Sequence, residues 1–109
     1  MIDLCYKLAV KCTKMTVDSF RDSLHQSEPP KQLTVYQLAM WYAGKDDWDK
    51  AHELVQDLPD QVAAHIHAYL HRVEGDIWNA DYWYQRAGRQ RPNNSTEAEW
   101  TEIVASLLQ

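Results

Sequence analysis

The sequence predicts an all-α protein built from stacked antiparallel helical hairpins, with about five or six helices in total. Apolar residues recur every three or four positions over most of the chain, which is the spacing of one helix face. Gly75 and Asp76 stand together where one helix is expected to end and the next to begin. Two stretches also match each other at an offset of 29 residues, which places Asp46 on Gly75. A chain of 109 residues is expected to form a single domain, residues 1–109.

Composition and charge exclude several classes of protein. Hydrophobic residues make up 45% of the chain and charged residues 25%, which is typical of a folded protein and unlike a disordered one. The net charge of −5 has the wrong sign for a general nucleic-acid-binding protein, so no nucleic acid is expected as a partner. No apolar run reaches the roughly 20 residues that span a membrane, so we expect no membrane association and a cytoplasmic location.

Residues 1–15 fit two patterns. Apolar residues alternate with charged ones from Ile2 to Lys11, which predicts a strand, whereas Cys5, Leu8 and Cys12 fit the spacing of a helix. We favour the helix, because a single strand in a helical chain would lack a partner within the molecule. A strand would imply pairing with another chain and hence a possible homodimer. The two cysteines are too far apart along either element for a disulfide, so free thiols are expected.

A short helix is predicted next, with Val17, Phe20 and Leu24 on one face. It must end before Pro29-Pro30, because proline disfavours helical backbone in the residue before it. We interpret residues 1–30 as an N-terminal cap segment. Its helix is expected to fold back across the proline linker and to insert Phe20 and Leu24 against the helix that follows, because a short stack would otherwise leave its first hairpin uncovered.

Two helical hairpins are then predicted. In residues 33–58, one helix begins after Thr34 and a second begins at Asp46 or Asp47. In residues 60–88, the first helix begins at Asp60 and the second at Asp76. These Thr and Asp residues are common at helix starts, because their side chains accept hydrogen bonds from the free backbone amides there.

A final amphipathic helix is predicted over residues 95–108. Glu99 follows Thr96 at the spacing of a capping box, and Trp100 begins the apolar face. One apolar face and one polar face are typical of a helix that caps the end of a stack. We therefore expect this segment to be a C-terminal capping helix.

The second hairpin resembles the tetratricopeptide repeat, in which small residues stand where two helices cross closely and large residues fill the gaps. The matching positions are Ala68, Gly75-Asp76, Ala80, Tyr84, Ala87 and Pro92. Residues 33–109 also resemble an uncharacterised bacterial and fungal protein family, through the stretches GKDDWDKAHELVQD and HAYLHRVEGDIWNADYWYQRAG. That second resemblance implies no functional site.

The repeat resemblance implies a protein or peptide interaction module of unknown biological role. Stacked hairpins of this kind bind partners on a concave face. No catalytic motif is present, so an enzyme is the less favoured interpretation, and no cofactor is expected. The positions that match the groove-lining residues of such repeats are Tyr36, Met40, Val62, His65, Tyr69 and Arg72.

A second candidate partner surface lies on the last helix of the second hairpin. Trp78, Tyr82 and Arg86 are spaced at i, i+4 and i+8, so they share one side of that helix. Aromatic side chains with a cationic end make stacking and cation–π contacts. This side is expected either to pack against the final helix through Trp100 or to contact a partner.

A histidine pair is the sharpest chemical feature of the sequence. His67 and His71 lie one helical turn apart, with Glu74 a turn further on, so the three side chains could hold a metal ion. His52 could complete such a site if the hairpins bring it near. The favoured alternative is that these histidines pack between helices through hydrogen bonds. The metal hypothesis would make the chain a small metal-binding protein or an enzyme.

Overall fold

Side-chain caps set the start of each α-helix in residues 15–109, the part of the chain that the computed structural model describes. In all six of these helices the capping residue is Ser, Thr or Asp, and its side chain accepts a hydrogen bond from the backbone N–H three residues on. This contact satisfies one of the amides that a helix start leaves unpaired. The caps are Thr16, Thr34, Asp47, Asp60, Asp76 and Ser95.

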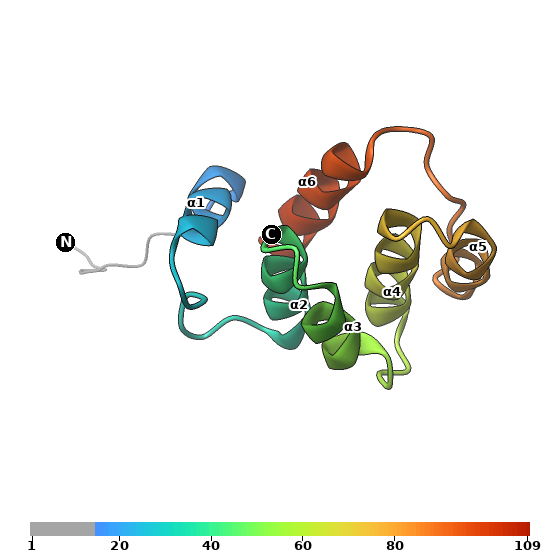
Figure 1. Cartoon of the computed structure of the whole chain (residues 1–109), viewed down its shortest axis with the longest axis horizontal. Helices are drawn as coiled ribbons and strands as arrows, with labels where there is room; N and C mark the ends of the chain where they lie inside the picture. Colours follow the sequence, from blue (N-terminus) through green and yellow to red (C-terminus); the bar gives the residue numbers. More distant parts are fainter. Residues whose placement is uncertain (1–14) are drawn as a thin grey trace.

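The described residues form an all-helical protein, as predicted. The elements in chain order are α1 (Val17–Asp22), the short 3₁₀ helix η1 (Ser23–His25), α2 (Val35–Gly44), α3 (Trp48–Val55), α4 (Gln61–Val73), α5 (Ile77–Arg86) and α6 (Thr96–Leu107). Neighbours in the sequence pack together, α2 with α3, α3 with α4, and α4 with α5 (Figure 1). None of these helices is long and apolar enough to cross a membrane. The alternatives for residues 1–14, including the state of Cys5 and Cys12, lie outside the described residues.

Helix α6 folds back over α2 and α4. A long loop follows α5, and α6 then contacts α1, α2 and α4 (Figure 1). The Trp100 indole donates a hydrogen bond of 2.9 Å to the Met40 carbonyl, and Ile103 and Val104 are buried in the same core. The apolar face of α6 therefore completes the main core. A helix at the end of the stack would instead pack on α5.

The predicted capping box at Thr96 and Glu99 is wrong. Ser95 is the N-cap and accepts a hydrogen bond of 3.0 Å from the Ala98 amide. Glu99 is only 2% exposed and bonds to side chains of α4 and α5. A buried carboxylate is costly without hydrogen-bond donors, and here distant parts of the chain supply them.

The N-terminal segment formed by α1 and η1 packs against both α2 and α6. Phe20 is fully buried, with its ring centroid 5.9 Å from that of Trp100. The Trp41 indole of α2 donates a hydrogen bond of 3.0 Å to Ser23. Leu24 lies against Gly44, near the end of α2. The predicted contact with α2 therefore exists, and α6 forms the other half of the Phe20 environment.

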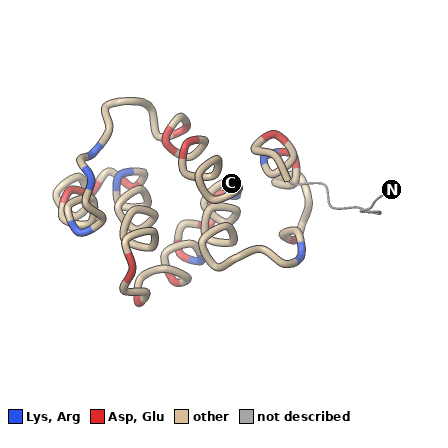
Figure 2. The backbone as a smooth tube through the Cα atoms, turned by 180° about the vertical axis from the view of Figure 1, so that it is seen from behind, with Lys and Arg blue, Asp and Glu red and all other residues tan. Residues whose placement is uncertain are grey.

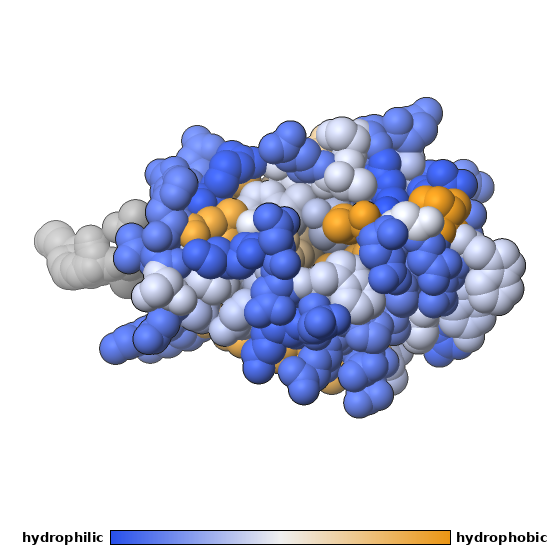
Figure 3. All heavy atoms as spheres, viewed as in Figure 1, coloured by the Kyte–Doolittle hydropathy of each residue, from blue (hydrophilic) through white to orange (hydrophobic). Residues whose placement is uncertain are grey.

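The surface carries charges of both signs. Acidic residues lie at the start of α6, and basic residues lie at the end of α5 and in the loop that follows it (Figure 2). One of the basic residues, Arg91, donates a hydrogen bond of 2.8 Å to Asp81. The face seen in Figure 3 is largely hydrophilic, with small apolar patches between the helices. Arg91 is therefore held in a local ion pair.

Candidate functional site

An exposed strip of Trp78, Tyr82 and Arg86 runs along α5, and we call it the α5 strip. Trp78 is 82% exposed and Tyr82 is 47% exposed. The Arg86 guanidinium lies 5.8 Å from the ring centroid of Tyr82 and 5.3 Å from that of Trp83. The expectation that the strip packs against the final helix through Trp100 is wrong, because Trp100 faces α2.

The residues predicted to line a groove lie mainly in the core or next to α6. Met40 and Tyr69 are buried. The side chains of His65 and Arg72 reach Glu99 of α6. Of the remaining two, Val62 is 43% exposed and Tyr36 is half-buried. The structure therefore places α6 against the helix faces that carry most of these side chains.

Three side chains meet at Glu99, and one of them also holds the loop before α6; we call this group the Glu99 network. The Tyr84 hydroxyl lies 2.7 and 2.8 Å from the two carboxylate oxygens. Arg72 Nη1 donates to Oε1 at 2.8 Å, and His65 Nε2 lies 3.2 Å from Oε2. Arg72 also donates to the backbone carbonyl of Asn94 in the loop before α6. The network therefore ties α4, α5 and this loop to α6.

The surroundings of Glu99 determine its protonation state. Burial by itself raises the pKa of this carboxyl group, but hydrogen bonds from His65, Tyr84 and Arg72 outweigh it, and the pKa is lowered overall. Burial, followed by the bond to Glu99, raises the pKa of the Tyr84 hydroxyl. At neutral pH the carboxylate is therefore ionised and Tyr84 is a neutral donor.

Three histidines meet between α3 and α4, and we call them the histidine cluster: His52, His67 and His71. Nε2 of His52 lies 3.0 Å from Nε2 of His67. One ring nitrogen of each histidine lies within 4.8 Å of those of the other two. His67 and His71 are buried and His52 is half-buried. The packing of α3 on α4 thus adds His52 to the pair that the sequence places on one helix.

Two tryptophans enclose the histidine cluster. Trp48 stacks on His52, with ring centroids 4.6 Å apart, and Trp83 stacks on His67 at 4.0 Å. The Trp48 indole donates a hydrogen bond of 2.6 Å to the Leu70 carbonyl, which fixes the orientation of its ring. Sequence reasoning missed both tryptophans as part of this site. The spacing of Trp48 and His52, one turn apart on α3, is a signal that could have found the first.

The environment favours the neutral form of two of these imidazoles, those of His67 and His52. Burial, with His52 and His71 nearby, lowers the pKa of His67 to about 4. Burial and the proximity of His71 also lower the pKa of His52. A neutral imidazole keeps a lone pair on one nitrogen, which can accept a proton or bind a metal ion.

Glu74 lies at the outer side of the histidine cluster. Its Oε1 accepts a hydrogen bond of 2.7 Å from Nδ1 of His71. The structure groups Glu74 with His71 and Asp76, and it groups His67 with His52 and His71. The predicted trio of His67, His71 and Glu74 is thus divided between two groups that share His71.

Comparisons with known proteins give no relative for this chain. No protein-family model matches it, and searches among curated proteins and solved structures find no significant match.

Proposed function

We propose that this chain is a small helical interaction module that binds a protein partner through the α5 strip. The observation that carries this proposal is the 82% exposure of Trp78, next to the half-exposed Tyr82 on the same helix face. Trp, Tyr and Arg are the residue types most enriched among the residues that dominate binding energy at protein interfaces. A face with all three in one strip suits this use.

The position of α5 at one end of the molecule favours this assignment. Helix α5 packs on α4, while α6 turns back toward α1 and α2 (Figure 1). The outer face of α5 is therefore where the next helix of a longer stack would pack. We propose that a partner helix occupies this place, with apolar side chains between Trp78 and Tyr82 and a carboxylate against Arg86.

Two matching turns support a repeat origin for this architecture. Asp46 and Gly75 stand at equivalent positions and both have left-handed backbone, with φ of 62° and 88°. The caps that follow them, Asp47 and Asp76, have ψ of 75° and 76°. The two turns thus resemble each other in backbone as well as in sequence, which supports the proposed repeat. In the proposed module α6 packs on α2 and α4, and the partner binds the exposed face of α5.

Affinity capture with matched variants tests the proposal. The immobilised full chain, Trp78→Ala and Val73→Ala are compared on lysate of the source organism, with quantitative mass spectrometry as the readout. Val73 is 47% exposed on α4 and lies outside the strip, so it is the control. The expected result is a protein retained by the control and lost by Trp78→Ala. With that protein purified, Trp78→Ala should weaken binding by about 30-fold, as loss of a residue worth about 2 kcal/mol requires.

Self-association is measured in parallel by sedimentation. A dimer that Trp78→Ala dissociates would identify the partner as a second copy of this chain. Equal retention of every captured protein by Trp78→Ala and Val73→Ala, together with an unchanged oligomeric state, would show that the α5 strip is not the binding face.

A further inference from the structure

We propose that His52, His67 and His71 form a binding site for one divalent transition-metal ion, with Glu74 as the hydrogen-bond partner that orients His71. This proposal is independent of the α5 strip. It extends the histidine pair of α4 by a ligand from α3 and gives Glu74 a supporting role.

The distances suit three ligands of one ion. Zinc binds histidine nitrogens at about 2.0–2.1 Å, and in a tetrahedral site neighbouring nitrogens are then about 3.3 Å apart. Nε2 of His52 and Nε2 of His67 are 3.0 Å apart, and a ring nitrogen of His71 lies within 4.8 Å of the others. His67 and His71 come from successive turns of α4 and His52 from α3. The proposed ion therefore requires side-chain rotation that brings the ring nitrogens closer together than they lie in the structure.

The Glu74 contact leaves His71 in the tautomer that a metal requires. Nδ1–H of His71 donates a hydrogen bond of 2.7 Å to the Glu74 carboxylate, so in the neutral imidazole the lone pair is on Nε2. Histidine ligands of metals commonly donate their other ring N–H to a carboxylate, which fixes the ring and increases its basicity. Glu74 is therefore a positioning residue for the proposed ion.

Protein contacts within the part of the chain that the structure describes leave one ring nitrogen of His67 without a hydrogen-bond partner. Its Nδ1 is buried and has no hydrogen-bond partner among the described residues. Its Nε2 faces Nε2 of His52, so one of these two nitrogens must carry a proton for the pair to form a hydrogen bond. Whichever tautomer His67 adopts, a buried nitrogen stays unpaired, and this is costly. A metal ion bound to both Nε2 atoms would replace this histidine–histidine hydrogen bond, and the proton of His67 would then be on Nδ1.

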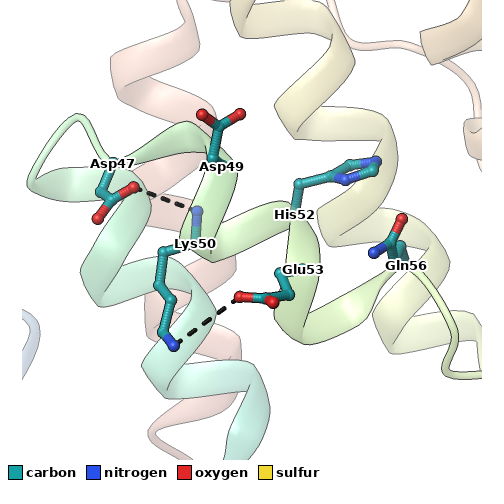
Figure 4. A pocket seen from close by; sticks show the side chains of 6 residues that line it. All are labelled: Asp47, Asp49, Lys50, His52, Glu53 and Gln56. Atoms are coloured by element: carbon teal, nitrogen blue, oxygen red, sulfur yellow. Dashed lines mark hydrogen bonds and ion pairs between the residues drawn. The ribbon is translucent and has the colours of Figure 1, made fainter.

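Access and charge both favour a cation. A surface hollow beside α3 is lined by Asp47, Asp49, Lys50, His52, Glu53 and Gln56 (Figure 4). Three of these residues are acidic and one is basic, so the hollow attracts cations. His52 belongs to this lining while its ring points toward α4 (Figure 4), where its Nε2 lies 3.0 Å from Nε2 of His67. His52 thus connects the hollow with the buried cluster.

The ligand set indicates the class of ion. Imidazole nitrogens suit zinc, copper, iron and nickel, whereas magnesium and calcium prefer oxygen ligands. Three histidines also leave a fourth position for water or a small ligand, as in zinc sites that are catalytic. Zinc is therefore the probe, and cobalt serves as its spectroscopic substitute.

The test is calorimetric titration of chelator-treated full-length protein with zinc. The background is Cys5→Ser, Cys12→Ser, so that thiols do not supply ligands. One ion per chain is expected. His52→Ala and His71→Ala should each weaken binding at least about tenfold, Glu74→Gln should weaken it by about 10–100-fold, and His25→Ala, an exposed histidine of η1, should bind like the parent. Circular dichroism confirms that each variant is folded.

Two readouts separate coordination from structural effects. Glu74→Gln should keep the melting temperature of the zinc-free parent while it changes the visible spectrum of the cobalt-loaded protein. In the parent itself, zinc should shift the ring nitrogen resonances of His52, His67 and His71 and leave those of His25 and His65 in place. This measurement needs no variant to fold. Absence of zinc binding, binding by His52→Ala equal to that of His25→Ala, or a titration that leaves the three ring signals unmoved would overturn the proposal.

Discussion

The hydroxyl of Tyr84 on α5 lies 2.7 and 2.8 Å from the two carboxylate oxygens of Glu99 on α6. Arg72 of α4 donates to the same carboxylate, so one buried anion connects the three helices α4, α5 and α6. Breaking a buried charge pair leaves the remaining charge without compensation, which makes this contact sensitive to substitution.

We expect Glu99→Ala to lower the free energy of unfolding by about 3–5 kcal/mol, because the Arg72 guanidinium then stays buried without its carboxylate. Glu97→Ala, on the exposed side of the same helix, should change it by no more than about 0.5 kcal/mol. Urea unfolding at pH 7 measures both. Similar small losses for the two variants would mean that the Glu99 network contributes little to stability.

The contribution of Glu99 should depend on pH. Its folded-state pKa is lowered from 4.5 by the bonds from His65, Tyr84 and Arg72, which together outweigh the effect of burial. A group with a lowered pKa stabilises the fold above its unfolded-state value, and this stabilisation is lost as the pH falls through the folded-state pKa. The difference in unfolding free energy between the parent and Glu99→Ala should therefore shrink as the pH falls below 4.5. A difference that stays constant down to pH 3 would contradict the assignment.

Phe20 tests whether the N-terminal helix belongs to the core. It is fully buried against Trp100, so Phe20→Ala should cost about 3–5 kcal/mol. Asp18→Ala on the exposed side of α1 is the control. Thermal unfolding followed by circular dichroism gives the comparison. If Phe20→Ala melts at the temperature of the control, α1 is an appendage to a core formed by the other helices.

Gly44 marks a close approach between α2 and η1. A Cβ at this position would lie 2.8 Å from Cδ1 of Leu24 and 3.2 Å from Cζ2 of Trp100. Gly44→Ala should therefore destabilise the protein by about 1 kcal/mol, although alanine favours a helix more than glycine does. In a Leu24→Ala background the same substitution should cost less, because Leu24 no longer occupies that space. Additive effects of the two substitutions in urea unfolding would show that Leu24 does not restrict Gly44.

The sequence by itself determined where most helices begin. Thr34, Asp60 and Asp76 each cap the helix that the sequence predicts to start there. These contacts join residues only three positions apart, so they depend on local backbone geometry and not on the rest of the fold. The i, i+4 spacing likewise brings His67 and His71 to one side of α4, with ring centroids 4.9 Å apart.

Only the tertiary structure decided which side chains of different helices meet. The spacing of Thr96 and Glu99 predicts a local cap, yet Glu99 bonds Tyr84 and Arg72, because the return of α6 over the other helices places donors there. The same holds for His52, which meets the α4 histidines only because α3 packs on α4. The direction in which the chain turns back after α5, and the side chains that become buried, depend on how all the apolar faces fit together. The spacing of apolar residues along one helix does not contain that information.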